Sequence, residues 1–249
     1  MSPEPAAHQL QRLKDILVEG AAILYARGLN DGFGHLSARV PGTDSFLITP
    51  KRRLGDLRPW QMAHVDFLGN ILEVGCGEGP PFERILHGAI YSLRPDVGAV
   101  ARTQALACEA FVIAGRSVRV AHDFGATAGE ETALFDNPHL IDNEEIALAC
   151  ARALGNRRAV LMRGNGNAVV GGDVMEAVVR AVFLEASARL QMAAGQLGEV
   201  GYLTREEFLA QEAEHSLIPH VERAWQGWLG EARDRGILRN WYDHRSYPR

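Results

Sequence analysis

Side chains that can exchange protons or hold a ligand gather in one stretch of this chain, where Glu83 is followed by His87 and Tyr91. His87 and Tyr91 are four residues apart in a segment with helical periodicity, so they are expected to share one face of a helix. A carboxylate such as Glu83 can abstract or return a proton if burial or its neighbours raise its pKa towards neutrality. For His87 the simpler interpretation is a buried histidine whose hydrogen bonds are satisfied.

Two further histidines lie where turns meet strands. His35 belongs to the turn Gly34-His35-Leu36-Ser37, where it either contacts a substrate or hydrogen-bonds its own loop. His122 follows a short apolar run and could line the same cleft.

The turn Gly164-Asn165-Gly166 lies between two apolar runs and resembles the start of a dinucleotide-binding motif. That motif requires a third glycine at position 169, where Val169 stands, and an acidic residue at a strand end about twenty positions later. Glu185 lies within a predicted helix instead. We therefore expect no dinucleotide and no other cofactor.

The three cysteines, Cys76, Cys108 and Cys150, are scattered without the Cys-x-x-Cys spacing. They predict neither a disulfide framework nor a thiolate zinc site, and we interpret them as reduced thiols.

The elements that position these residues are visible in the hydrophobic pattern. Apolar spacing predicts helices at residues 9–27, 82–93, 105–114, 143–154 and 173–197. Apolar runs between turn residues predict strands at residues 36–40, 46–49, 63–67, 71–74, 97–100, 118–121, 159–162 and 168–170. Thr204 and Glu207 have the spacing of a capping box that begins a last helix.

Strands that arrive first as hairpins and then between helices favour a mixed sheet with helices on both faces. We predict an α/β fold of three layers, α/β/α, around a central mixed, largely antiparallel sheet. One domain covers residues 1–210, and residues 211–249 form a C-terminal helical extension. Its aromatic residues Trp225, Trp228, Trp241 and Tyr242 are expected to pack on a neighbouring subunit, or else on the domain itself.

The composition of the 249 residues is that of a globular protein, with 47% hydrophobic and 23% charged residues. A formal net charge of -5 and the absence of a basic run argue against nucleic acid as a partner. Residues 1–8 lack the pattern of a signal peptide, and no apolar stretch is long enough to span a membrane. We expect a cytoplasmic protein with no membrane partner.

Three segments in order resemble the class II aldolase and adducin family. They are Gly-Phe-Gly-His-Leu-Ser-Ala-Arg at residues 32–39 with Phe-Leu-Ile-Thr-Pro at 46–50, residues 83–91 running to Arg-Pro-Asp-Val at 94–97, and Leu-Met-Arg-Gly-Asn-Gly at 161–166 running to Leu-Glu at 184–185. The resemblance covers roughly residues 8–210 and implies the fold predicted above. It also implies a homotetramer with active sites at subunit interfaces.

Metal-dependent members of this family carry His-x-His on a strand and a third histidine in a glycine-flanked turn. The matching positions here are Arg102, Gln104 and Asn165. Arginine cannot be deprotonated to bind a metal, and amide oxygens are poor ligands for a borderline ion such as zinc. The resemblance therefore implies a relative that has lost the family's metal site.

The resemblance also matches Glu83 to the acid/base glutamate of the aldolases. We hypothesise a metal-independent lyase for a small carboxylated substrate, in which Arg102 stabilises an enolate-like intermediate and Glu83 moves the proton. Gln104 and Asn165 would add amide donors. The other candidate substrate contacts are His35, Ser37, His87, Tyr91 and His122.

The subfamily is indicated by short strings. The Gly-His-x-Ser turn, the Arg-Gly-x-Gly turn and residues 184–191 look like the branch that contains hydroxyaryl and pyridine dicarboxylate decarboxylases. Sugar-phosphate aldolases place small hydroxyl residues before the acid/base glutamate, whereas this chain has Pro80-Pro81-Phe82. A sugar phosphate is thus a poor substrate candidate.

Three alternatives stay open at this point. Arg102 and Glu83 could form a structural ion pair, which would lower the pKa of Glu83 and weaken it as a base. The chain could be a non-catalytic binding protein, as the head domain of adducin is. A metal site could also be rebuilt from His35, His87 and His122.

Overall fold

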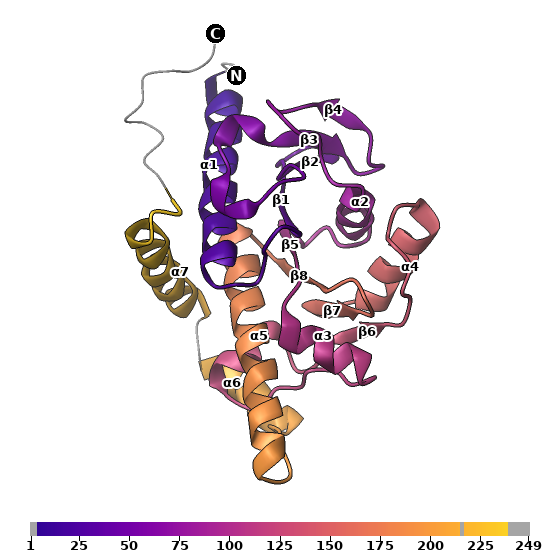
Figure 1. The fold of residues 1–249 in the computed structure, drawn as a ribbon, viewed down its shortest axis with the longest axis vertical. Coiled ribbons are helices and arrows are strands. Elements are labelled where there is room, and N and C mark those ends of the chain that lie inside the picture. Colours follow the sequence, from indigo (N-terminus) through magenta and orange to yellow (C-terminus); the bar gives the residue numbers. More distant parts are fainter. Residues whose placement is uncertain (1–3, 215–216, 239–249) are drawn as a thin grey trace.

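The computed structural model describes residues 4–214 and 217–238, and its elements are shown in Figure 1. The strands are β1 (His35–Arg39), β2 (Ser45–Ile48), β3 (Ala63–Asp66), β4 (Ile71–Glu73), β5 (Ala99–Thr103), β6 (Ala133–Phe135), β7 (Ala159–Met162) and β8 (Asn167–Gly171). The α-helices are α1 (Glu4–Ala26), α2 (Arg84–Leu93), α3 (Leu106–Ile113), α4 (Glu144–Leu154), α5 (Val174–Leu197), α6 (Arg205–Glu214) and α7 (Leu217–Asp234). Short 3₁₀ helices cover Leu54–Asp56, Pro59–Gln61 and Asp123–Ala128.

Within the described residues the strands form one sheet in the order β4-β3-β2-β1-β5-β8-β7-β6. Every neighbouring pair is antiparallel except β6 with β7, which is parallel. This confirms the predicted mixed, largely antiparallel sheet. The order also places β1 and β5, which are distant in sequence, side by side at the centre.

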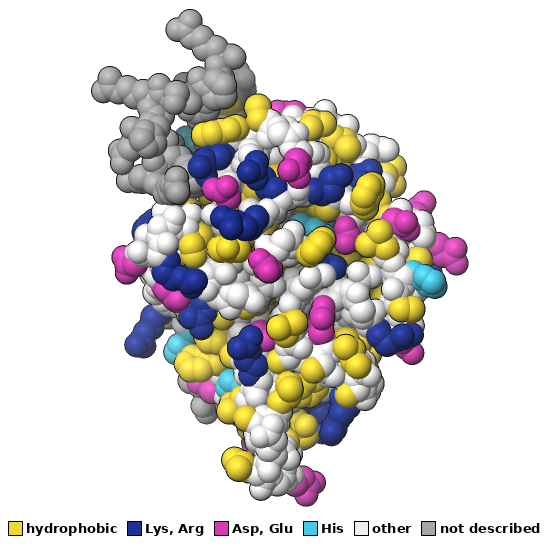
Figure 2. All heavy atoms as spheres, in the orientation of Figure 1, with side chains coloured by type: hydrophobic (Ala, Val, Ile, Leu, Met, Phe, Trp, Pro, Cys, Tyr) yellow, Lys and Arg dark blue, Asp and Glu magenta, His cyan; other side chains and the backbone are white. Residues whose placement is uncertain are grey.

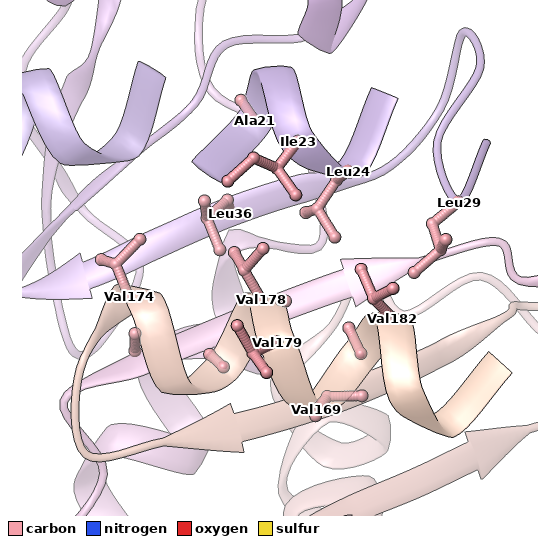
Figure 3. Close-up of a cluster of buried hydrophobic side chains, with 14 of the residues drawn as sticks. Ala21, Ile23, Leu24, Leu29, Leu36, Val169, Val174, Val178, Val179 and Val182 are labelled. Atoms are coloured by element: carbon pink, nitrogen blue, oxygen red, sulfur yellow. The ribbon is translucent and has the colours of Figure 1, made fainter. Parts of the chain in front are cut away.

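Helices cover both faces of the sheet, as Figure 1 shows. One hydrophobic cluster lies between the sheet and α1, α3 and α5, and a second lies between the sheet and α2 and α4. Figure 3 shows the first of them, where Leu24 from α1, Leu36 from β1 and Val178 from α5 meet. Alternate residues of β1 and β5 therefore face different layers.

The C-terminal helix packs within the chain. Val221, Trp225 and Leu229 of α7 join the cluster of α1 and α5, and the guanidinium of Arg27 lies 5.4 Å from the ring centre of Trp228. Trp225 and Trp228 therefore lie against their own domain, which is the second of the two expected placements. The predictions for Trp241 and Tyr242 fall outside the described residues.

Most predicted elements are confirmed within one to three residues, including the capping box, in which Thr204 and Glu207 exchange hydrogen bonds. The strand predicted at residues 118–121 is wrong, because that segment makes only an isolated bridge between Arg119 and Glu131. Strand β6 was not predicted, and β5 extends three residues beyond the predicted strand. That extension matters, because it places Arg102 inside the sheet.

The face drawn in Figure 2 carries lysine and arginine side chains interspersed with acidic and hydrophobic ones. Among the described residues, no helix combines the length and the apolar character that a membrane span requires.

Candidate active site

The candidate site is built on the pairing of β1 with β5. His35 is opposite Arg102 and Ser37 is opposite Val100 in the antiparallel register. Because side chains alternate along a strand, His35, Ser37 and Arg102 point to the layer of α2 and α4. Leu36 points the other way, into the cluster of α1 and α5.

Two glycines allow the chain to approach the backbone of β5 at this point. Gly34 has φ +111°, and a Cβ there would lie 2.9 Å from the carbonyl oxygen of Arg102. Gly166 has φ +68°, and a Cβ there would lie 2.0 Å from the carbonyl oxygen of Thr103. Side chains rarely adopt this φ, so glycine is required at both positions. The turns that carry His35 and Asn165 are thereby held against the end of β5.

Glu83 lies just before α2 and faces both side chains of the β1–β5 pair. Its Oε1 is 3.8 Å from an Nη atom of Arg102, and its Oε2 is 3.6 Å from Nε2 of His35. Both separations are longer than a hydrogen bond. The carboxylate is 16% exposed, whereas Arg102 and His35 are nearly inaccessible. Glu83 is therefore the member of the group through which the site meets the surface.

The charge state of Glu83 is set by these neighbours. Burial alone would raise its pKa, but His35, the backbone and Arg102 outweigh burial and lower the pKa to about 2. Glu83 is thus a carboxylate at neutral pH. The predicted ion pair with Arg102 is present and lowers the pKa in the predicted direction, but His35 contributes more to this lowering than Arg102 does.

Arg102 supplies a buried positive charge. Burial lowers its pKa while Glu83 and Glu109 raise it, and a guanidinium keeps its proton under these conditions. One Nη atom donates to Oδ1 of Asn165 at 3.3 Å, and Nδ2 of Asn165 donates to the carbonyl oxygen of His139 at 2.8 Å. Asn165 is therefore oriented with its oxygen towards the cation.

His87, Ser37 and Tyr91 lie behind His35. Nε2 of His87 is 2.8 Å from Nδ1 of His35, and the hydroxyl of Ser37 is 2.6 Å from Nδ1 of His87 and 2.7 Å from the hydroxyl of Tyr91. Ser37 and His87 are completely buried and Tyr91 is 1% exposed. Burial lowers the pKa of both histidines and raises that of Tyr91, so all three side chains are neutral near neutral pH.

One predicted site residue, His122, is not drawn into this group. His122 precedes the 3₁₀ helix at residues 123–128 and shares a 2.8 Å hydrogen bond with Ser187 of α5, on the opposite layer of the sheet. Gln104 follows β5, and its backbone N–H donates to the carbonyl oxygen of Leu29. Within one chain, His35, His87 and His122 do not converge, so they do not form the alternative metal site considered above.

Two residues that support the site, Asn30 and Arg39, were not predicted from the sequence. The side chain of Asn30 donates to the carbonyl oxygen of Arg102 at 3.3 Å, and Arg39 donates to the carbonyl oxygens of Tyr91 and Arg94 at the end of α2. The signal for Arg39 was its position two residues after Ser37 on the same strand, which places it on the same face. Asn30 had no signal beyond its place before a glycine-rich turn.

The side chains of Arg102 and Asn165, at positions that the resemblance matches to metal ligands, do not fit a divalent cation. Arg102 offers a fixed positive charge instead of a lone pair, and the oxygen of Asn165 is already bonded to it. Within residues 4–214 and 217–238, no group of three or more histidine, cysteine or acidic residues is arranged to hold a metal.

Comparison with known proteins agrees with this architecture. The 3,4-dihydroxyphthalate decarboxylase of Terrabacter sp. is 30% identical over 72% of this chain and 80% of its own length. Decarboxylase tropJ of Talaromyces stipitatus is 25% identical over 90% of this chain and 95% of its own length. The 5-methylthioribulose-1-phosphate/5-deoxyribulose-1-phosphate aldolase of Rhodospirillum rubrum is 29% identical over 78% and 87%.

Two solved structures show the same fold at lower identity. An aldolase II superfamily protein from Pseudomonas syringae superposes with a TM-score of 0.79 at 23% identity, over 95% of this chain and 96% of that one. The L-fuculose 1-phosphate aldolase from Glaciozyma antarctica gives 0.77 at 20% identity, over 92% of each chain. The family model described as Class II Aldolase and Adducin N-terminal domain matches residues 15–192. This match and the sequence relatives show that the chain belongs to the class II aldolase and adducin family.

Proposed function

We propose that this protein is a metal-independent lyase of the decarboxylase type that acts on a small carboxylated aromatic or keto compound. The observation that carries the proposal is the buried guanidinium of Arg102, which faces Glu83 and Asn165 where metal-dependent members of the family keep a cation. The decarboxylases among its relatives support this choice of reaction.

Arg102 is suited to stabilise charge that develops during carbon–carbon cleavage. When a carboxylate leaves as carbon dioxide, the electron pair of the broken bond stays on the substrate and spreads onto a conjugated oxygen. A guanidinium held in a buried position interacts with that oxygen strongly and needs no reorganisation. The amide of Asn165 keeps the guanidinium oriented.

Glu83 is proposed to handle the proton. In the free protein its low pKa, held down by His35 and to a smaller extent by the backbone and Arg102, makes it a weak base. An anionic substrate bound to Arg102 would offset the contribution of Arg102, and its own negative charge beside the carboxylate would raise the pKa of Glu83. The same substrate would displace water and desolvate the carboxylate further, which also raises the pKa. Substrate binding therefore prepares Glu83 to take a hydroxyl proton from the substrate and return one to its carbon.

The reaction balances as the loss of carbon dioxide and the gain of one proton at the same carbon. Aldol-type cleavage passes through a similar enolate, so Arg102 would serve both reactions. A sugar phosphate remains a poor candidate, although the Rhodospirillum rubrum relative is named for such substrates. Pro80, Pro81 and Phe82 offer no hydroxyl groups for a phosphate before Glu83.

The non-catalytic alternative is less well supported by the geometry. A binding protein has no need to direct a buried arginine, a carboxylate and the unpaired nitrogen of His35 towards one point. We also retain the proposals of a homotetramer and of a cytoplasmic location, with no nucleic-acid partner.

The direct test is carbon dioxide release from dihydroxyaryl carboxylates, beginning with 3,4-dihydroxyphthalate. Wild-type protein is expected to release carbon dioxide after dialysis against a chelator, and Arg102→Ala is expected to lose this activity. Arg205→Ala, on the surface of α6, is the matched control that keeps it. No carbon dioxide from any member of a panel of aromatic and keto acids would reject the proposal.

A further inference from the structure

A continuous series of polar contacts runs from the core to the candidate site. It begins at the hydroxyl of Tyr91 and passes to Ser37 at 2.7 Å, to Nδ1 of His87 at 2.6 Å and from Nε2 of His87 to Nδ1 of His35 at 2.8 Å. Nε2 of His35 then faces Glu83 at 3.6 Å. Between its two ends, Ser37 and His87 each have one hydrogen-bond partner on each side.

The direction in which the hydrogen bonds of this series donate follows from Glu83, which lies at one end of it. A carboxylate beside the permanent charge of Arg102 accepts hydrogen bonds and does not donate them. The nitrogen of His35 that faces it is therefore favoured to carry the hydrogen. A neutral imidazole has one N–H, so Nδ1 of His35 must accept from Nε2 of His87.

The same reasoning continues into the core. Since Nε2 of His87 donates, its Nδ1 accepts from the hydroxyl of Ser37, and the oxygen of Ser37 accepts from Tyr91. All the hydrogens then point towards Glu83. In the opposite arrangement, His35 would turn a lone pair towards the carboxylate, and Ser37 would donate to Tyr91 and leave the tyrosine hydrogen without this partner.

The core end of the series is held rigidly. The ring of Tyr91 stacks 5.7 Å from Phe67 and lies 5.2 Å from Phe46, and the guanidinium of Arg39 lies 4.9 Å from its centre. Burial raises the pKa of Tyr91, so its hydroxyl keeps its hydrogen. A phenolate here would be costly, and the series is therefore suited to orientation and not to net proton supply.

The site end of the series is unsatisfied. Nε2 of His35 is buried and has no hydrogen-bond partner, although the side chain is 4% exposed. A buried donor without a partner is costly unless a ligand completes it. His35 is opposite Arg102 in the register of β1 with β5, and both side chains face the carboxylate of Glu83.

We propose that Ser37, His87 and Tyr91 are positioning residues that hold His35 as the tautomer with hydrogen on Nε2, so that His35 presents a fixed neutral donor to a substrate oxygen. The substrate oxygen would thus meet two donors, the imidazole N–H of His35 and the guanidinium of Arg102. The catalytic consequence rests on the proposed function, whereas the tautomer of His35 does not.

The tautomer is tested on the whole protein by ¹⁵N magic-angle-spinning NMR after labelling with ¹⁵N-histidine. The signals of His35 and His87 are identified by their loss in His35→Gln and His87→Gln. Both rings are expected to show a protonated, pyrrole-type Nε2 and an unprotonated, pyridine-type Nδ1 at neutral pH. A protonated Nδ1 on His35 would overturn the inference, and so would a doubly protonated ring.

Ser37→Ala tests the direction of the next hydrogen bond in the series, the one between Ser37 and His87. It should move the Nδ1 signal of His87 towards that of an unbonded nitrogen and lower kcat on the order of tenfold with little change in KM. Ser45→Ala is the matched control, because Ser45 on β2 makes an equivalent 2.8 Å contact with His64 outside the site. It should leave the His35 and His87 signals and kcat unchanged. An unmoved Nδ1 signal in Ser37→Ala would remove Ser37 from the series.

The two proposals fail separately. If the NMR signals are as expected and no substrate is turned over, the orientation of His35 stands and the lyase proposal falls. If carbon dioxide is released but His35 carries its hydrogen on Nδ1, the lyase proposal stands and the positioning role is wrong.

Discussion

Arg102 donates a hydrogen bond of 3.3 Å to the amide oxygen of Asn165, so two of the positions that the family resemblance matches to metal-binding histidines are joined to each other. The backbone of both residues is held by close contacts at Gly34 and Gly166. On our proposal, the difference from a metal site therefore lies in the side chains and not in the path of the chain.

This relationship predicts that a metal site can be restored. The combined variant Arg102→His, Gln104→His and Asn165→His presents two imidazoles from one segment and a third from the neighbouring turn. It is expected to bind on the order of one zinc per chain by elemental analysis. Wild-type protein treated identically is the control and is expected to bind far less. Equal and stoichiometric zinc in both proteins would contradict our account of Arg102.

Removal of the Arg102 guanidinium should lower the turnover rate more than it weakens the binding of the uncharged parts of the substrate. Arg102→Lys keeps a charge but loses the planar fork, so it is expected to retain part of the activity, while Arg102→Ala loses about a thousandfold in kcat. Steady-state kinetics with an active carboxylated substrate measures both. Circular dichroism checks that the variants are folded. Unchanged kcat in Arg102→Ala would exclude this residue from catalysis.

Stability should fall in acid partly through Glu83. Its pKa is lowered from 4.5 to about 2 in the folded protein, so its contribution is present at neutral pH and is lost as the pH falls through this window. The stability difference between wild type and Glu83→Gln should therefore shrink between about pH 5 and pH 2. Urea unfolding across this range provides the measurement. A difference that grows on acidification would show that the sign is wrong.

The turn before His35 should tolerate no side chain. Gly34→Ala combines an unfavourable φ with a Cβ 1.9 Å from the side chain of Asn30, so a loss of about 3 kcal/mol is expected. Gly32→Ala, two residues earlier in open space, should change stability by less than about 0.5 kcal/mol. The two free energies of unfolding from urea titrations decide the matter, and equal values would contradict the predicted strain.

The proposed homotetramer predicts a mass of four times 27.2 kDa by light scattering. Leu106 and Ile113 of α3 are 70% and 69% exposed in the single chain, which is costly for large apolar side chains if they stay in water. Ile113→Glu is expected to lower the measured mass. A single-chain mass for the wild type would reject the tetramer.

Much of the fold could be predicted because long apolar patterns specify elements by themselves. The helix at α5 was predicted within one residue, since its apolar positions recur over many turns and Asp173 caps it. Strand β6 has three residues and pairs in parallel with β7, so its only support is tertiary and no local pattern marks it. Residues 118–121 have the composition of a strand. They form no strand, because they pair only through the isolated bridge between Arg119 and Glu131.

The site was predictable only where the spacing of residues along one element was enough to place them together. The four-residue spacing of His87 and Tyr91 indicated a shared face, but only the pairing of β1 with β5 brings Ser37 and His35 to that face. Burial, which decides that Ser37, His87 and Tyr91 lie behind His35, depends on aromatic side chains distant in sequence, Phe46 of β2 and Phe67 just after β3. His122 could not be assigned to a layer from sequence, because its segment is irregular.

The close approach of Gly34 and Gly166 to β5 also bears on how this fold can change its chemistry. Both contacts are made by main-chain atoms, so they persist whatever side chains stand at positions 102 and 165. The backbone around the site is therefore held in place, while the side chains that supply its positive charge can be exchanged. Protein engineers could screen side chains at those two positions without redesigning the surrounding turns.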